Sequence, residues 1–387
     1  MRLILFTGKG GVGKTSVAGA TALVAAKRGL KTLVMSTDPA HSLADSIDAE
    51  VGDQPTMVDS GLWAQQIDTQ QRLETSWREV REYALELLSW LGLSGIEAEE
   101  LSIIPGLDEL FSLADLKQHH SAGAYDLVVV DCAPTAETMR LLSLPEVLSW
   151  YIEKVFPVNR KIVNTVRPVL QRIKSLPPIA SDDVFAAIER FYDRVDGIKQ
   201  VLADAATTSI RLVVNPEKMV IAEAERTFSY LCLFGYRVDA VVVNRIIPDE
   251  VTDAYFDRWR DIQAQHLERI EQSFAPVPIL KARLFDTEVV GTQALGRLGA
   301  EIYGGSDPAA ILHTDEVMKL VDRTLMIKVP FASKGDIDVN RRGQELFVRV
   351  GSNKRVVALP VVLQGAQVGA ASLDGGWLSV SFDTGHA

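Results

Sequence analysis

Cysteine is scarce in this sequence, and both a long apolar run and an excess of basic side chains are missing. The two cysteines, Cys132 and Cys232, stand 100 positions apart, which excludes a disulfide framework and a CxxC zinc clamp and fits a reducing compartment. No window approaches about 18 consecutive apolar residues, and the short run Leu3–Phe6 lacks the features of a signal peptide. We therefore expect a soluble, cytoplasmic protein.

The 387 residues carry 40 Lys and Arg against 51 Asp and Glu, a formal net charge of −11. Nucleic-acid binding needs a basic surface, so this balance argues against nucleic acid as a partner. The 67 residues from 321 onward carry 8 basic and 6 acidic side chains, a net of +2. Subtracting this +2 from −11 leaves −13 for the first 320 residues.

Short apolar runs alternate with segments of helical periodicity along most of the chain. Helical spacing is found, for example, at 16–28, 219–234 and 252–272. The apolar runs are those of buried strands, at 2–6, 32–36, 125–131, 210–215, 239–244 and 276–280. Strands that alternate with helices predict an α/β fold, with a doubly wound, mostly parallel sheet.

Two long segments, 70–120 and 148–206, are helical in pattern, which predicts a helical subdomain inserted into the α/β core. After residue 320 the pattern changes to short strands separated by turn residues, as in a small all-β sandwich. We therefore predict two domains, one over 1–320 and one over 321–387.

A phosphate-binding loop stands between the first predicted strand and the first predicted helix. The run from Gly8 to Thr15 matches G-x-x-x-x-G-K-[ST], whose glycines turn backbone N–H groups toward phosphate oxygens at a helix N-terminus. Lys14 would reach the β- and γ-phosphates, and Thr15 would ligate Mg²⁺. The motif predicts a P-loop NTPase core that binds ATP and Mg²⁺ through Gly8, Lys9, Gly10, Gly11, Val12, Gly13, Lys14, Thr15 and Ser16.

The same glycines also satisfy G-x-G-x-x-G, the dinucleotide fingerprint, and Asp38 ends the second predicted strand, where a ribose-binding acid would stand. That alternative leaves Lys14 and Thr15 unexplained. A second feature, Asp131 at the end of the apolar run VVVD, favours the NTPase, since a Walker-B carboxylate holds Mg²⁺ through water.

Three stretches together resemble the ArsA/GET ATPases over about residues 1–320: KGGVGKTS, STDPAHSLADS and DCAPTAETMRLLSLPE. The resemblance implies an ATP hydrolase in which Lys9 crosses a dimer interface to the partner's phosphates. It also implies that Asp45 orients the attacking water and that His41 is a hydrogen-bonding residue of the same switch. Because the chain has one phosphate loop, we expect a homodimer around two nucleotides.

Further positions match the family on the base side of the nucleotide. Asn244 corresponds to the asparagine that reads the adenine edge, and Asn215, Pro216 and the run Glu288–Gly291 match positions near the base. The loop at Leu284 and Phe285 lacks the usual proline.

Three departures from the family pattern stand out. Glu137 and Cys132 replace a histidine and a threonine of the second switch. No CxxC follows Asn244, so we expect no zinc. Cys132 and Cys232 cannot form the cysteine cluster of the arsenite branch, so arsenite transport is not expected.

The last segment resembles an α-crystallin (small heat-shock) domain, because Ala371 to Leu378 follows A-x-x-x-[NG]-G-x-L. A chain with both parts resembles the paralogue class of cyanobacteria and plastids.

A hydrophobic client is expected to bind the helical insert. One helical face of the acid-free segment 155–181 would form a wall with Ile162, Val166, Val169, Leu170 and Ile173, and the earlier insert would supply Trp90 and Leu91. The resemblance implies a client such as a tail-anchored membrane segment, and the basic rim predicts a transient membrane or receptor contact. The alternative is a core-packed helix with a solvated basic face.

Three functions therefore stay open. The first is a homodimeric Mg²⁺-dependent ATPase that gates a client groove. The second is a holdase chaperone whose nucleotide is mainly structural, and the third is a positioning ATPase of the MinD/ParA type.

Overall fold

The structure is a computed structural model that describes residues 1–38, 42–67, 82, 85, 107–150 and 182–383. Its centre is an eight-stranded sheet with the strand order β3-β4-β2-β5-β1-β6-β7-β8. All pairs are parallel except β3 (Thr56–Asp59) with β4 (Leu62–Gln66). The parallel strands are β1 (Arg2–Thr7), β2 (Thr32–Ser36), β5 (Leu127–Asp131), β6 (Thr208–Val214), β7 (Val238–Ile246) and β8 (Ile279–Arg283). The predicted α/β fold with a mostly parallel sheet is confirmed.

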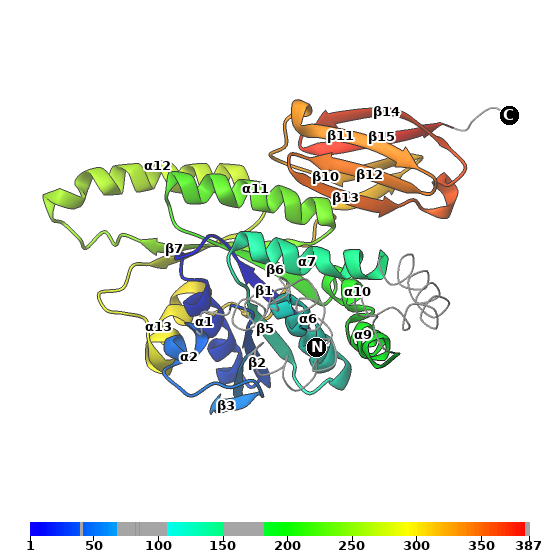
Figure 1. Ribbon diagram of the computed structural model, residues 1–387. Coiled ribbons are helices and arrows are strands. Elements are labelled where there is room, and N and C mark those ends of the chain that lie inside the picture. The colour runs from blue at the N-terminus through cyan, green and yellow to red at the C-terminus, as the bar shows by residue number, and fades with distance from the viewer. Residues whose placement is uncertain (39–41, 68–81, 83–84, 86–106, 151–181, 384–387) are drawn as a thin grey trace.

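Helices cover both faces of this sheet (Figure 1). On one face α1 (Lys14–Lys27) packs against α2 (Ser42–Ile47) and α13 (Gly291–Tyr303). The other face carries α6 (Leu107–Ala122), α7 (Thr135–Trp150), α9 (Asp182–Val195), α10 (Ile198–Ala203), α11 (Lys218–Phe234) and α12 (Asp257–Phe274). The central strands β1, β2, β5, β6 and β7 are mostly apolar and buried, which is why they read as hydrophobic runs.

Two elements start clearly later than predicted, while the others start within two residues of the predicted position. The strand expected at 276–280 begins later, at Ile279, because Pro276 and Pro278 have no N–H to donate to a neighbouring strand. The helix expected from 252 begins at Asp257, after the short 3₁₀ turn η2 (Ala254–Phe256), where Asp253 accepts a hydrogen bond from the Tyr255 N–H.

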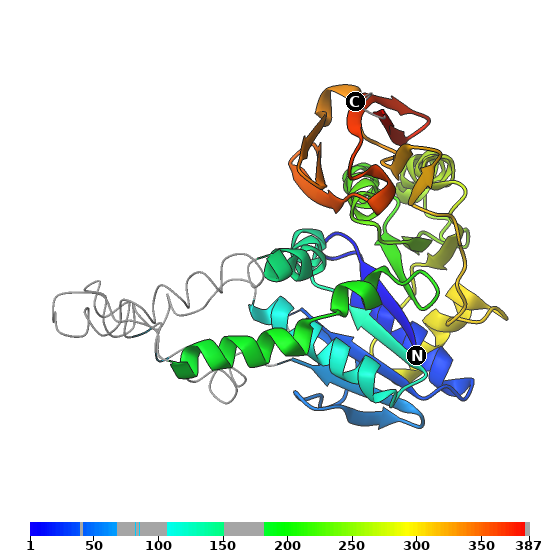
Figure 2. The ribbon, with the colours of Figure 1, turned by 90° about the vertical axis from the view of Figure 1, so that its right-hand side faces the viewer.

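The helical inserts are described only in part. Within 70–120 and 148–206 the described residues form α6, α9 and α10 with the end of α7, and these helices contact one another on one side of the sheet (Figure 2). The seven residues proposed for the client groove lie outside the described residues, as does His41. No helix in the described part of the chain combines the length and the hydropathy that a membrane crossing requires.

The C-terminal part is a small all-β sandwich, as predicted. Its sheets have the orders β14-β15-β10-β9 and β11-β12-β13, and every pair is antiparallel. The strands are β9 (Met318–Val321), β10 (Thr324–Lys328), β11 (Ile337–Arg342), β12 (Glu345–Val350), β13 (Asn353–Ala358), β14 (Gln367–Asp374) and β15 (Trp377–Asp383); two 3₁₀ turns, η3 (Lys334–Asp336) and η4 (Val361–Leu363), join some of them. The first strand of the sandwich thus starts at Met318.

The sandwich rests on the C-terminal half of α11 (Figure 1). Leu233 of α11 belongs to the apolar core of the sandwich, and Arg355 donates to the Leu233 carbonyl. Phe331 packs in the other direction, with its ring 6.2 Å from Phe228 and 5.8 Å from Phe274. The two parts therefore share apolar contacts through one helix.

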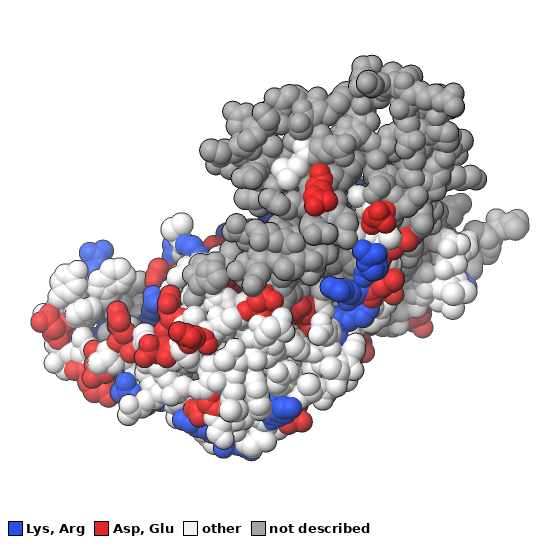
Figure 3. Space-filling view, turned by 60° about the horizontal axis from the view of Figure 1, so that its bottom comes forward, with Lys and Arg blue, Asp and Glu red and all other residues white. Residues whose placement is uncertain are grey.

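Charged side chains on the described surface are mixed. On the face shown in Figure 3, acidic side chains gather over the left part, with basic ones scattered among them. This distribution fits the net negative charge of the first 320 residues.

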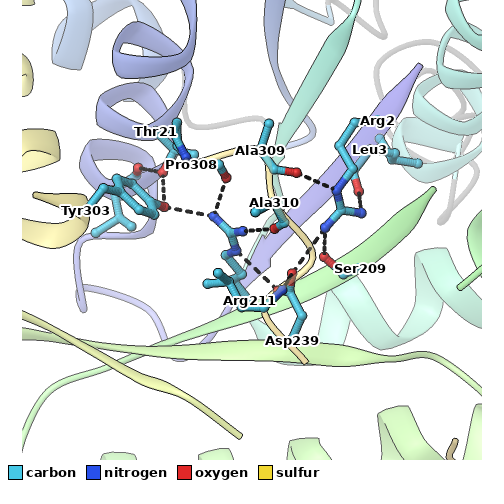
Figure 4. Close-up of polar contacts among 12 residues, drawn as sticks. Arg2, Leu3, Thr21, Ser209, Arg211, Asp239, Tyr303, Pro308, Ala309 and Ala310 are labelled. Carbon is cyan, nitrogen blue, oxygen red and sulfur yellow. Dashed lines mark hydrogen bonds and ion pairs between the residues drawn. The ribbon is translucent and has the colours of Figure 1, made fainter. Parts of the chain in front are cut away.

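A buried polar network ties the segment after α13 to the amino ends of three strands (Figure 4). The Arg211 guanidinium is fully buried and donates to Asp239 at 3.2 Å, to the Tyr303 hydroxyl at 3.0 Å and to two backbone carbonyls, of Pro308 and Ala310. Arg2 donates to the second oxygen of Asp239 at 3.1 Å. A buried ion pair is stable only when its remaining donors and acceptors are hydrogen-bonded, and the other bonds of this network meet that requirement.

Candidate functional site

The phosphate loop adopts a conformation that two of its glycines make possible. Gly8 and Gly13 have φ angles of 154° and 91°, in the range that L side chains avoid. A Cβ at Gly8 would lie 2.3 Å from the Val213 carbonyl oxygen, and one at Gly13 would lie 2.4 Å from Asn244 Nδ2. The loop is thus pressed against the ends of β6 and β7, between β1 and α1.

The two polar residues that close the motif have defined partners. Lys14 is buried, and its Nζ donates to the Lys9 carbonyl at 3.3 Å, so that the side chain folds back over its own loop. The hydroxyls of Thr15 and Ser42 lie 3.2 Å apart, which joins the start of α1 to the start of α2. Ser42 belongs to the stretch that contains Asp45.

A cavity of about 410 Å³ opens in front of this loop. It brings together Lys14 and Thr15 with Asp45 from α2 and Pro134 from the loop after β5. The full lining is Gly10, Gly11, Gly13, Lys14, Thr15, Ser16, Asp38, Ser42, Asp45, Ser46, Pro134, Arg245, Val289 and Val290. Most of the residues that the sequence assigned to phosphate binding therefore line one space with Asp45, which it assigned to water orientation.

Asp131 is buried at the end of β5, and neither carboxyl oxygen has a hydrogen-bond partner among the described residues. Burial raises its pKa to about 7, while the nearby Thr15 hydroxyl and Lys14 ammonium act in the opposite direction. A buried carboxyl with two unsatisfied oxygens beside Thr15 fits a hard cation with its waters. The donors are all oxygen, which suits Mg²⁺.

A second cavity, of about 650 Å³, adjoins the first. It contains Asn244 and the loop at Leu284 and Phe285, with Glu288 and Val289 of the run expected near the base. The Asn244 amide holds the phosphate loop, because Nδ2 donates to the Val12 carbonyl at 2.9 Å and Oδ1 accepts from the Arg245 N–H at 2.9 Å.

The remaining predicted residues lie near the loop without lining either cavity. Gly8 and Val12 are buried behind it, and Lys9 is half-buried. Asn215, just past β6, is buried, and its Oδ1 has no hydrogen-bond partner in the described part of the chain. Pro216 follows it at the surface.

The loop after Asp131 is joined to two other parts of the core. The Ala133 N–H donates to Thr37 Oγ1 at 3.2 Å, next to the first switch stretch. Thr135 Oγ1 donates to Glu223 of α11 at 3.0 Å. Cys132 is fully buried, and burial raises its pKa above the usual range of a thiol. Glu137 is exposed.

Two residues of the site were not predicted. Ser42 lies inside the first switch stretch, between His41 and Asp45, and that position could have indicated it. Arg245 lines both cavities with a φ of 58°, which no composition or spacing rule predicts.

Comparison with known proteins decides the family. Residues 1–304 match the family described as Anion-transporting ATPase, and residues 322–382 match the HSP20-like domain found in ArsA. The chain belongs to the ArsA ATPase family. Membership makes this chain an ATP hydrolase that binds nucleotide, and the likeness expected from three short stretches is confirmed over most of its length.

Relatives in this family extend over the whole chain. A putative arsenical pump-driving ATPase of Chlorobaculum tepidum is 39% identical over 392 residues, which cover 99% of this chain and 96% of the relative. A second, from Aquifex aeolicus, is 38% identical over 388 residues, covering 97% and 98%. ATPase get3 of Aspergillus niger is 28% identical over 300 residues, covering 76% of this chain and 88% of the relative. The ArsA-family ATPase described here thus has both full-length relatives and a relative that matches mainly the ATPase part.

Proposed function

We propose that this ArsA-family ATPase works as a Mg²⁺-dependent homodimer whose nucleotide state opens and closes a groove for an apolar client. The observation that carries the proposal is the cavity in which Lys14, Thr15 and Asp45 meet, with the unsatisfied Asp131 carboxyl beside Thr15. We further propose a division into two domains near residue 320, with the first sandwich strand starting slightly earlier, at Met318. We also propose a cytoplasmic location, which suits two reduced, buried cysteines.

Thr15 and Asp131 are the residues that would hold Mg²⁺, Thr15 directly and Asp131 through water. Bound there, the ion would neutralise charge on the phosphate oxygens. Lys14 would leave the Lys9 carbonyl and move to the terminal phosphates. The hydrogen bond that it would give up is long, at 3.3 Å, so little is lost when the side chain leaves that carbonyl.

Asp45 is proposed to orient the attacking water. It lies in the first turn of α2 and lines the cavity together with Thr15 and Ser42, so a water between Asp45 and a terminal phosphate lies within the same space. Positioning of this kind contributes roughly 10²- to 10⁴-fold to rate.

Lys9 is proposed to reach the phosphates of a second copy. The chain has one phosphate loop, and Lys9 is half-buried at its outer turn, beside the exposed Gly10 and Gly11. A second cation at the transferring phosphoryl group offsets charge that builds up during reaction. Dimer closure would therefore depend on nucleotide.

The client is proposed to be an apolar protein segment, such as the membrane segment of a tail-anchored protein, held by the helical insert. Support comes from the family likeness, which includes ATPase get3, and from the apolar pattern of 155–181. A transient membrane or receptor contact belongs to the same proposal, and nucleic acid does not.

Arsenite is not proposed as a substrate, although two relatives are named putative arsenical pump-driving ATPases. Cys132 and Cys232 lie on separate elements and are both buried. Burial raises the pKa of Cys232 to about 12 and that of Cys132 further, so neither is poised to be a thiolate ligand. Arsenite should leave the steady-state ATPase rate unchanged, and clear stimulation would reverse this part of the proposal.

The test is the variant Asp45→Asn in the full chain. We expect steady-state ATP hydrolysis to fall at least 100-fold while ATP binding is kept, and client to stay bound in the presence of ATP. Asp48→Asn, three residues along the chain and outside both cavities, is the matched control and should hydrolyse normally. Unchanged turnover in Asp45→Asn would remove the assigned role. Client release that ignores nucleotide altogether would favour the holdase function, in which the sandwich does the binding.

A further inference from the structure

Arg245 occupies an unusual place in the backbone. The pairing of β7 with β8 is shifted between Val243 and Ile246, so the strand is irregular just where it passes the phosphate loop. Arg245 takes a φ of 58°, a left-handed conformation that is uncommon for a residue with a side chain. Asn244 Oδ1 holds it there by accepting its N–H at 2.9 Å. Irregularities of this kind redirect a side chain, and they cluster at functional sites.

The two cavities meet at Arg245. Four residues line both of them, and these four define the junction: Gly13, Ser16, Arg245 and Val289. On one side of the junction lie Lys14 and Thr15, and on the other lies Asn244. Among the residues that the structure describes, Arg245 is the only cation that lines both spaces.

The other cations around the two cavities already have partners. Lys14 donates to the Lys9 carbonyl, and Arg283 pairs with Glu301 at 2.8 Å and with Glu250 at 3.4 Å. Within the described residues, the exposed Arg245 guanidinium makes no hydrogen bond or ion pair. An arginine guanidinium is well suited to bind phosphate oxygens, and one that makes no hydrogen bond beside a phosphate loop is available to do so.

We propose that Arg245 binds the α-phosphate of the nucleotide. The inference rests on the proposed placement, with the terminal phosphates at Lys14 and Thr15 and the base beside Asn244. In a nucleotide that spans the two cavities, the group between the terminal phosphates and the ribose lies at the junction. That group is the α-phosphate, so the α-phosphate is the anion next to Arg245. Arg245 is thus a binding residue held in place by the same amide that anchors the phosphate loop.

The direct test measures ADP affinity by calorimetry at fixed ionic strength for Arg245→Gln and Arg245→Lys in the full chain. Loss of a charge-assisted hydrogen bond should weaken ADP binding roughly 10- to 100-fold in Arg245→Gln, and Arg245→Lys should recover part of it. Phosphorus NMR should show the α resonance of bound ADP displaced in Arg245→Gln and the β resonance little changed. Arg258→Gln, an exposed residue of α12 outside both cavities, is the charge-matched control and should keep its affinity within about twofold.

A third variant separates binding from folding. Arg245→Gly accepts the left-handed conformation without strain, so its melting temperature should be no lower than that of the parent, while its ADP affinity falls as in Arg245→Gln. Normal ADP affinity in Arg245→Gln with an unmoved α resonance would overturn the inference and leave the proposed function intact. An equal loss of affinity for adenosine would assign Arg245 to the base instead, which also overturns it. Absence of ADP binding by the parent chain would overturn both proposals.

Discussion

Asp131 shows how burial changes the acidity of one carboxyl group. Its carboxyl lies at the end of a buried strand, where water is excluded and no described side chain satisfies either oxygen. An ionised carboxylate in such a place is costly, and the group responds by holding its proton to a pKa of about 7. The burial that suits this carboxyl to a cation therefore makes its ionised form costly.

Stability of the nucleotide-free and Mg²⁺-free protein should depend on pH through Asp131. Its folded pKa is raised above the unfolded value, so the unfolded state loses its proton first, and the free energy of unfolding should fall as pH rises from about 4 to about 7. Asp131→Asn should remove this fall, on the order of a few kcal/mol, as measured by urea unfolding across that range. Asp261→Asn, an exposed carboxyl of α12, should keep the fall. An identical pH slope in the parent chain and in Asp131→Asn would contradict the assignment.

Residues with a short motif around them could be predicted from the sequence, and residues placed by tertiary contacts could not. The loop from Gly8 to Thr15 and the acid Asp131 each follow an apolar strand, and that local context is what their chemistry requires. Arg245 and Ser42 reach the same cavity through a strand irregularity and a helix start. Neither feature has a sequence signature strong enough to read in one chain.

At the scale of elements, close packing between α1 and α13 brings the phosphate loop and the second cavity into contact. A Cβ at Gly299 would lie 2.4 Å from Val24 Cγ2 and 2.9 Å from the Ala20 carbonyl oxygen, so the two helices touch through this glycine. The helix α1 follows the phosphate loop directly, and α13 follows the loop that lines the second cavity. A change in their spacing would alter both cavities together.

Gly299→Ala should lower stability even though alanine is the better helix former. The added methyl meets backbone, which cannot move aside as a side chain can, so the overpacking cost is expected in the upper part of its usual range, at about 2–3 kcal/mol. The helical gain of about 1 kcal/mol offsets part of it. We expect a net loss of about 1–2 kcal/mol in the free energy of unfolding, measured by chemical denaturation. Gly305→Ala, where an added Cβ meets nothing within 4 Å, should change it by less than about 0.5 kcal/mol. A higher free energy of unfolding in Gly299→Ala would contradict this prediction and would show that α1 and α13 can move apart at little cost.

The main elements were predictable because buried parallel strands and amphipathic helices have strong periodic signals. The hairpin of β3 and β4 was missed, since Thr56–Asp59 is short and partly exposed and lies at the edge of the sheet. Edge strands bury little, so their sequences carry little apolar pattern. The late start of β8 has a different cause, because Pro276 and Pro278 interrupt the run in which the strand was expected.

At the scale of the whole molecule, the Arg211 network fastens the chain segment between the two parts to the sheet. Residues 308–310 contribute backbone carbonyls to Arg211 and Arg2, and Asp239 from β7 balances both guanidinium groups. The sequence offered no sign of this, since the partners lie nearly 100 positions apart in sequence.

Arg211→Met should destabilise the protein strongly. The Pro308 and Ala310 carbonyls would lose a buried donor, and one oxygen of Asp239 would lose its guanidinium partner while the other keeps Arg2 and the Leu312 N–H. We therefore expect a loss of about 3–5 kcal/mol in the free energy of unfolding. Thermal and urea unfolding would measure it, with Arg226→Met, an exposed residue of α11, as the matched control within about 0.5 kcal/mol. A loss below 1 kcal/mol would show that methionine packing replaces the network.

Because α11 packs against both the ATPase sheet and the sandwich, the two domains cannot be separated simply by cutting the chain between them. Leu233 fills the sandwich core, and Phe331 fills the gap between α11 and α12, so each part completes the apolar interior of the other. A proteolytic cut in the connection between α13 and β9 would therefore leave two fragments that stay associated, because covalent continuity is not what joins them. A gene shortened before β9 would expose Leu233 and would remove the Phe331 ring from Phe228 and Phe274, which would keep their ring contact with each other. Any loss of activity in the shortened protein could then come from the exposed apolar surface of α11 and not from the missing sandwich. The contribution of the sandwich is better tested by substitutions on its outer strands.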